Sequence, residues 1–198
     1  MAFSNSLTTR QDVCHQSMHF IWCLTGLTAF VLTQAYGLEV YFSPSPDCEK
    51  RIIGAIDDSK TEVIAAVYSI NNVAISEALT RAKKCGVAIR LLTDYTQATQ
   101  KSSQALALQK AGLDVRLHSK FKIEHNKFGV YDSKLVSTGS FNWTRPASES
   151  NSENCVFIDD VATITKFRDR FEFLWKENSS EASLAKIEKL NSKMKNGQ

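Results

Sequence analysis

Two copies of the triplet His-x-Lys begin seven residues apart in this chain, at His118–Lys120 and at His125–Lys127. In an extended segment, residues i and i+2 point to the same side, so each copy can aim an imidazole and an ammonium at one point. An imidazole can attack phosphorus or carry a proton near neutral pH. A lysine ammonium neutralises phosphate oxygens. Either triplet is therefore suited to chemistry on a phosphate ester.

The residues that follow distinguish the two copies. His125 and Lys127 begin the pattern HxKx4Dx6GS, in which every fixed position is filled. The pattern and its continuation supply five further candidate residues: Asp132, Gly139, Ser140, Asn142 and Glu153. The first copy fails, because the position that should carry Asp holds His125 itself. We predict that His118 and Lys120 form an ordinary strand end and that the second copy is the reactive one.

These residues lie among alternating strand-like and helix-like segments. The apolar, β-branched runs predict strands at 38–44, 61–70, 87–94, 114–118 and 155–159, and a hairpin of 127–132 and 134–138 with a turn at Asp132-Ser133. Helical periodicity predicts helices over 47–58, from Asn72 or Ser76 to about Cys85, from the end of the third strand to Ala111, and over 161–176. This order predicts an α/β fold with helices on both faces of a mixed β-sheet.

Composition agrees with a globular domain. The chain has 198 residues, of which 43% are hydrophobic and 23% charged, and a net charge of +3. This charge does not oppose a polyanionic partner, but it is too small to indicate one. We assign residues 36–178 to one catalytic domain. A basic tail follows at 179–198, which we expect to be a loose helix or a disordered, solvated segment.

The N-terminal residues 1–35 form a hydrophobic leader. Residues 18–33 are an apolar run of sixteen, followed by Thr33-Gln34-Ala35, which is small at both positions that signal peptidase reads. The run is short for a membrane span, which needs about 20 residues, and longer than most signal-peptide cores. We favour a cleaved export signal that sends the protein to the periplasm or out of the cell. An uncleaved membrane anchor is the alternative.

Three cysteines follow the leader, at positions 48, 85 and 155. Their odd number and wide spacing predict neither a disulfide framework nor a zinc knuckle. Cys85 and Cys155 lie in apolar stretches, so we expect them to be small buried hydrophobic residues.

The text HNKFGVYDSKLVSTGSFNWT, followed by SNSENCVFID, resembles the signature of the phospholipase D superfamily. It is most similar to the branch with a single copy of the motif, which includes Nuc-like bacterial endonucleases and mitochondrial Zucchini-type proteins. The resemblance extends more weakly from about Leu38 to Trp175. The leader and the tail lie outside it.

The resemblance implies a role for each matching residue. His125 would be the nucleophile that forms a phosphohistidine, and Lys127 would bind the phosphate. Ser140 and Asn142 would hold the phosphate oxygens and the lysine, and Glu153 would accept a hydrogen bond from the far nitrogen of His125. Glu149 is a nearby competitor for that last role.

Two other positions follow from the same resemblance. Asp132 matches the third letter of the family motif and is counted with the catalytic residues, although its role in the family is more often structural. Gly139 would let the backbone approach the phosphate closely. Arg145 is a departure from the pattern that would add a phosphate contact if it points inward.

The mechanism needs two histidines, and this chain has one complete motif. The resemblance therefore implies a homodimer with one shared active site, in which one His125 attacks and its symmetry mate protonates the leaving oxygen. We expect no metal and no cofactor, because the chain shows no HExxH motif, no carboxylate cluster and no Cys/His ligand set.

The expected reaction is hydrolysis of a phosphodiester. We favour an endonuclease that takes single- or double-stranded DNA or RNA. A phospholipase D that acts on phosphatidylcholine or cardiolipin is the alternative, and a catalytically silent binding protein is a third reading. Contact with a membrane is expected only if the leader is retained or the substrate is a lipid.

Overall fold

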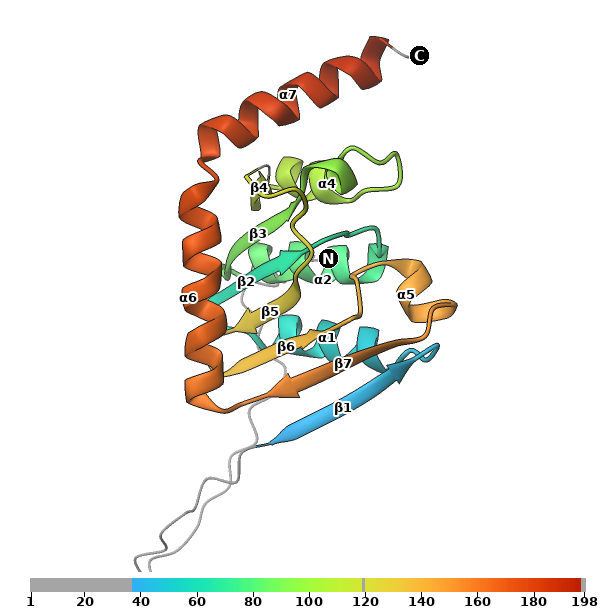
Figure 1. Ribbon diagram of the computed structural model, residues 1–198, viewed down its shortest axis with the longest axis vertical. Helices are drawn as coiled ribbons and strands as arrows, with labels where there is room; N and C mark the ends of the chain where they lie inside the picture. Colours follow the sequence, from blue (N-terminus) through green and yellow to red (C-terminus); the bar gives the residue numbers. More distant parts are fainter. Residues whose placement is uncertain (1–36, 119, 197–198) are drawn as a thin grey trace, which may run out of the picture. The chain divides into compact units, whose positions relative to one another are not determined.

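The computed structural model describes residues 37–118 and 120–196 (Figure 1). The strands of this part of the chain are β1 Leu38–Ser43, β2 Glu62–Val67, β3 Ala88–Asp94, β4 Asp114–His118, β5 Lys127–Tyr131, β6 Leu135–Gly139 and β7 Glu153–Ile158. The helices are α1 Asp47–Asp58, α2 Val73–Lys84, α3 Tyr95–Ala98, α4 Ala105–Lys110, α5 Arg145–Glu149, α6 Val161–Glu177 and α7 Ser180–Asn196.

The strands form one mixed sheet in the order β1-β7-β6-β5-β2-β3-β4. The pairs β2–β3 and β3–β4 are parallel, and the other neighbours are antiparallel. In Figure 1, α6 lies on one face of the sheet, and α1 and α2 lie on the other. The predicted α/β fold with helices on both faces of a mixed sheet is confirmed.

Strand β2 shows why the sheet needs a helix on each face. Val63, Ala65 and Val67 belong to the core beneath α1 and α2. The alternate residues Ile64 and Ala66 pack in the second core with α6. A strand buried on both faces reads as a continuous apolar run, which is what the sequence shows at this point.

Several strand ends that carry candidate residues lie at one end of the sheet. The register pairs Val67 with Lys127, Gly139 with Cys155, and Ser43 with Glu153. The start of β5, the end of β6 and the start of β7 therefore lie side by side with the ends of β1 and β2. We call this the site end of the sheet.

One prediction about a helix was wrong in part, and one short helix was not predicted. The helix predicted to run to Ala111 is divided into α3 and α4. Near the break, side chains form hydrogen bonds with the backbone that compete with the bonds of a continuous helix. The Thr99 hydroxyl donates to the Thr96 carbonyl, and the Ser103 hydroxyl accepts from the Ala105 amide. The short helix α5 was not predicted.

The C-terminal segment forms a helix, which is one of the two forms predicted for it. Residues 180–196 form the regular helix α7, which packs on β4. Ser183 and Ile187 are buried, and the Ser183 hydroxyl accepts a hydrogen bond of 3.1 Å from the Leu117 amide. Ile187 is thus buried beside the sheet, whereas most of the other described side chains of α7 are exposed, as expected of a solvated helix.

The cysteine prediction was wrong as well. Cys48, on α1, and Cys155, on β7, form a disulfide with their Cα atoms 6.0 Å apart. The pairing could not be predicted from sequence spacing, because the two cysteines are 107 positions apart and only the fold brings them together. Cys85 is exposed at the end of α2, so the expectation that it is buried was also wrong.

The leader predicted at residues 1–35 lies outside the described residues. Among the helices that the structure describes, none is both long and apolar enough to cross a membrane.

Candidate active site

His125 and Lys127 lie where the connection from β4 enters β5. The Tyr68 amide donates a hydrogen bond of 2.7 Å to the carbonyl of Asn126, which fastens this segment to the end of β2. His125 is exposed, and Lys127 is half-buried. The imidazole predicted to be the nucleophile is therefore open to a substrate at the site end of the sheet.

Tyr68 is a site residue that sequence reasoning missed. Its ring lies 4.5 Å from the imidazole of His125, centroid to centroid, and 5.1 Å from the ammonium of Lys127. The Gln97 side chain donates a hydrogen bond of 2.9 Å to the Tyr68 hydroxyl. The sequence feature that could have indicated Tyr68 is its position at the end of a buried strand. A large ring with a hydroxyl group is not needed there to fill the core.

The ammonium of Lys127 donates a hydrogen bond of 2.7 Å to the backbone carbonyl of His125. Burial lowers the pKa of Lys127, and the carboxylates of Glu153 and Glu124 oppose that shift. The lysine thus stands beside the imidazole as a partly desolvated cation. Such a cation interacts more strongly with a phosphate than one fully in water.

Ser140 and Glu153 contact each other directly across the ends of β6 and β7. The Ser140 hydroxyl donates a hydrogen bond of 2.5 Å to Glu153 and accepts one of 3.1 Å from the Asn154 amide. The other carboxylate oxygen of Glu153 accepts from the Asn151 side chain at 3.0 Å. Among the described residues no hydrogen bond joins Glu153 to His125, so that pairing stays a prediction.

Gly139 and Asn142 complete the predicted set at this end of the sheet. Gly139 has a φ of 145°, and a Cβ at this position would collide with the carbonyl oxygen of Asn154. The glycine therefore allows close approach of β6 to β7. The side-chain oxygen of Asn142 is buried and has no hydrogen-bond partner among the described residues.

A buried polar network supports the segment before His125. Glu124 is 2% exposed, and it accepts hydrogen bonds from the backbone and the side-chain nitrogen of Asn126. Its own amide donates 3.0 Å to Asp94 at the end of β3. His118 is buried close by, with its Nδ1 3.9 Å from Glu124, and burial lowers its pKa. The first His-x-Lys copy is thus a strand end, as predicted.

The structure does not bring Asp132 to this site, which corrects its place among the catalytic residues. Asp132 follows the last residue of β5, at the opposite end of the strand from Lys127 and about 15 Å away. Its carboxylate accepts hydrogen bonds from the amides of Lys60, Thr61 and Glu62. Burial alone would raise the pKa of Asp132, but these bonds outweigh it and the pKa lies below its ordinary value.

Arg145 and Glu149 pair with each other. The Arg145 guanidinium donates hydrogen bonds of 2.8 Å to the Glu149 carboxylate within α5, and both side chains are exposed. Glu149 is therefore occupied on α5, whereas Glu153 begins β7 beside Ser140. This placement favours Glu153 as the carboxylate of the site.

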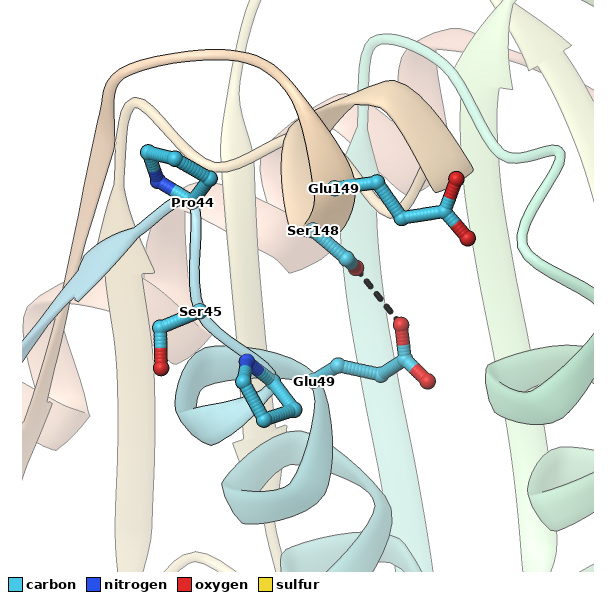
Figure 2. A pocket seen from close by; sticks show the side chains of 6 residues that line it. Pro44, Ser45, Glu49, Ser148 and Glu149 are labelled. Carbon is cyan, nitrogen blue, oxygen red and sulfur yellow. Dashed lines mark hydrogen bonds between the residues drawn. The ribbon is translucent and has the colours of Figure 1, made fainter.

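A separate pocket of about 410 Å³ opens between α1 and α5 (Figure 2). It is lined by Pro44, Ser45, Pro46, Glu49, Ser148 and Glu149. The Ser148 hydroxyl donates a hydrogen bond of 2.6 Å to Glu49, which Figure 2 draws as a dashed line. The two carboxylates would repel a phosphodiester, so we do not assign the reaction to this pocket.

Comparison with known proteins gives the family. The family model described as cardiolipin synthase, PLD-like domain, matches residues 52–175, which is more than half of the chain. The chain belongs to the phospholipase D-like family. Within residues 37–118 and 120–196, no group of three or more His, Cys, Asp and Glu residues is placed to hold a metal ion.

Two solved structures share the fold of this family member. Nuc from Salmonella typhimurium, described as a phospholipase D family member, has a TM-score of 0.70 and 31% sequence identity, covering 73% of this chain and 97% of that chain. NucT from Helicobacter pylori has a TM-score of 0.69 and 25% identity, covering 73% of this chain and 98% of that chain.

Relatives with assigned names come from two groups. A mitochondrial cardiolipin hydrolase from Danio rerio is 31% identical over 161 residues, which are 81% of this chain and 67% of that protein. A phospholipase D from Rickettsia conorii is 37% identical over 119 residues, which are 60% of each protein. The chain thus spans less than two thirds of the Rickettsia relative. The names of these two relatives thus differ, one being a cardiolipin hydrolase and the other a phospholipase D.

Proposed function

We propose that this protein is a metal-independent endonuclease that hydrolyses DNA or RNA through a phosphohistidine at His125. The observation that carries the proposal is the exposed imidazole of His125 beside the ammonium of Lys127, with Ser140, Asn142 and Glu153 at the same end of the sheet. The match to Nuc and NucT over nearly the whole of those chains supports the choice of a nuclease.

In the first step, a ring nitrogen of His125 attacks phosphorus and forms a P–N bond, while the P–O bond to the leaving group breaks. The leaving oxygen takes a proton from the partner subunit's His125. Lys127 neutralises the non-bridging oxygens as negative charge gathers on them. Glu153 would hold the positively charged ring, as an acceptor does in other nucleophile–base arrangements.

In the second step, water attacks the same phosphorus and gives its proton to the partner subunit's His125. The P–N bond then breaks, and His125 is released. Each chain supplies one His125, so we propose a homodimer with one active site across its two-fold axis. The buried, unpartnered oxygen of Asn142 supports a site that a ligand or a second subunit completes, because a lone buried acceptor is costly.

The second candidate is a phospholipase D that cleaves phosphatidylcholine or cardiolipin. The names of the Rickettsia and Danio relatives favour it. So do the exposed apolar side chains of β1, since Leu38, Val40 and Phe42 are 67%, 47% and 67% exposed on one side of an edge strand. A lipid substrate would go with a retained leader at residues 18–33.

We propose export to the periplasm or beyond through residues 1–35, with membrane anchoring as the alternative. The disulfide between Cys48 and Cys155 supports a compartment outside the cytosol, because such bonds persist in oxidising surroundings.

The deciding experiment uses the full chain in EDTA. It is given labelled single-stranded DNA and RNA, and in parallel vesicles of phosphatidylcholine or cardiolipin, and product release is followed. Cleavage of nucleic acid with unchanged vesicles supports the nuclease. Head-group release with intact nucleic acid overturns it in favour of the phospholipase. His125→Ala should abolish whichever activity is found, and unchanged activity in that variant would show that the site is assigned wrongly.

A further inference from the structure

A group of exposed apolar side chains lies just before His125 in the chain. Phe121 and Ile123 belong to the connection from β4 to β5 and are 43% and 47% exposed. Phe173, on α6, is 45% exposed. The guanidinium of Arg170 lies over both rings, 5.8 Å from Phe121 and 5.2 Å from Phe173. We call Phe121, Ile123, Arg170 and Phe173 the loop platform.

The ring of Phe121 is held flat against the protein. It stacks on the imidazole of His118, with centroids 5.3 Å apart and planes inclined by 18°. The Phe121 amide also donates a hydrogen bond of 2.9 Å to Nε2 of His118. His118 itself is 1% exposed, so the Phe121 ring rests on a buried side chain. The ring is thus supported on one face and still open to solvent in part.

Lysines flank Phe121 in the sequence, and the Arg170 guanidinium lies near both rings. Lys120 and Lys122 alternate with Phe121 and Ile123 along the connection, and both lysines are exposed. Lys120 forms an ion pair with Glu177 at the end of α6, which fixes the connection to that helix. An aromatic ring flanked by two lysines suits a strand whose bases stack and whose phosphates are negative.

The platform is within reach of the reacting atoms. Ile123 precedes His125 by two residues, so their Cα atoms are at most about 7 Å apart. Phe121 precedes His125 by four residues, which limits the separation to about 14 Å. A nucleic-acid strand continues on both sides of the bond being cut, so it can contact residues at both of these distances from His125.

We propose that the loop platform binds the single-stranded nucleic acid next to the scissile phosphate, with a base on Phe121 and phosphates on the neighbouring cations. This inference rests on the proposed nuclease function and extends it to a named specificity surface. A flat, supported ring is a stacking surface rather than a side chain that projects into a bilayer. Membrane-binding surfaces instead need a broad apolar face.

The test separates stacking from general apolar contact. Phe121→Leu keeps an apolar side chain but removes the flat ring, and Phe173→Leu does the same on α6 without altering the connection. Val161→Ala is the matched control, because Val161 is 63% exposed at the other end of α6. Each substitution is made in the full chain, both with His125 and in a His125→Ala background that stops turnover.

Three measurements are compared. The first is the dissociation constant of a fluorescent oligothymidylate for the His125→Ala proteins, read by anisotropy. The second is hydrolysis of bis(p-nitrophenyl) phosphate, a diester without bases, by the proteins that retain His125. The third is co-sedimentation with phosphatidylcholine and cardiolipin vesicles. Because stacking of one base is worth about 1–3 kcal/mol, Phe121→Leu should weaken oligothymidylate binding roughly tenfold and leave the small diester unaffected.

Each outcome decides the inference. Weaker oligothymidylate binding with unchanged hydrolysis of the small diester supports it. Binding equal to that of the Val161→Ala control overturns it, and so does a loss of vesicle binding without a change for the oligonucleotide. If the oligonucleotide binds through Phe121 but is never cut, the proposed nuclease fails and the platform stands. If it does not bind at all, both fail.

Discussion

The ammonium of Lys127 is bonded to the backbone carbonyl of His125, two residues before it, at 2.7 Å. A lysine ammonium has three hydrogens, so this bond leaves others for a phosphate oxygen. The contact fixes the cation next to the residue proposed to attack phosphorus. The spacing His-x-Lys is therefore a geometric requirement as well as a sequence signature.

Activity should fall at alkaline pH as Lys127 loses its proton. Burial lowers the pKa of Lys127, so we expect this fall below the ordinary lysine value of 10.5. The Glu124 carboxylate raises that pKa, so Glu124→Gln should move the alkaline limb to lower pH. The limb is measured as kcat/KM for a small diester against pH. Glu77→Gln, an exposed carboxylate on α2, is the control, and an equal limb in both variants would contradict this role of Glu124.

Both histidines of a shared site should be needed. When His125→Ala chains are mixed with wild-type chains in equal amounts and allowed to exchange subunits, only about a quarter of the dimers carry two wild-type chains. Activity should therefore fall to about a quarter of that of the wild-type protein at the same total concentration. Activity that falls only to one half would indicate independent sites. Sedimentation at the assay concentration checks that the protein is dimeric.

Tyr68 should act through its ring. The ring contacts both His125 and Lys127, whereas the hydroxyl bonds to Gln97. Tyr68→Ala should lower kcat by about 10- to 100-fold, because small misplacements of reacting groups carry such penalties. Tyr68→Phe keeps the ring and should retain most of the activity. Equal losses in the two variants would assign the effect to the hydroxyl.

The sequence predicted those parts of the site that depend on residues close together in the chain, and missed those that depend on residues far apart in it. The strand alternation and the HxKx4Dx6GS spacing are local patterns, and they placed His125, Lys127, Ser140 and Glu153 near the ends of correctly predicted strands. The contact of Tyr68 with His125 depends on the pairing of β2 with β5, which are far apart in the sequence. No local pattern carries that information.

Asp132 shows the converse limit. Its place in a catalytic signature suggested a catalytic role, whereas its carboxylate binds the backbone that leads into β2. A sequence motif shows which residue type occupies a position, but it does not show whether that residue takes part in catalysis or stabilises the fold. The Cys48–Cys155 disulfide was missed for the same reason as the contact of Tyr68, because its two cysteines are far apart in the sequence and only the fold brings them together.

Asp132 should therefore matter for stability and little for catalysis. Asp132→Ala removes an acceptor of several amide hydrogen bonds and should lower the free energy of unfolding by about 2 kcal/mol, as measured by urea denaturation. Because its folded pKa lies below 3.8, this stabilisation is present above that pH and is lost as the pH falls through the folded value. Asp58→Asn, an exposed residue at the end of α1, is the control. A large fall in kcat for Asp132→Ala, with the fold intact, would return it to the catalytic set.

The disulfide should contribute strongly to stability. The bond closes a loop of more than a hundred residues, and the loss of such a bond costs about 2–5 kcal/mol in small exported domains. The double variant Cys48→Ala/Cys155→Ala should unfold at lower urea concentration than the oxidised wild type. Under reducing conditions, the two proteins should unfold at similar concentrations. Identical unfolding of both under oxidising conditions would contradict a stabilising bond.

The pairing of β1 with β7 has a consequence for the order in which the domain can be built. A chain made from its N-terminus presents the apolar side chains of Leu38, Val40 and Phe42 early, but the neighbouring strand is among the last to be synthesised. Until β7 is synthesised, β1 lacks the strand that it pairs with, and Cys48 lacks the cysteine that it bonds to in the structure. The yield of native protein should thus depend on chaperones and thiol oxidation that act after Cys155 is available.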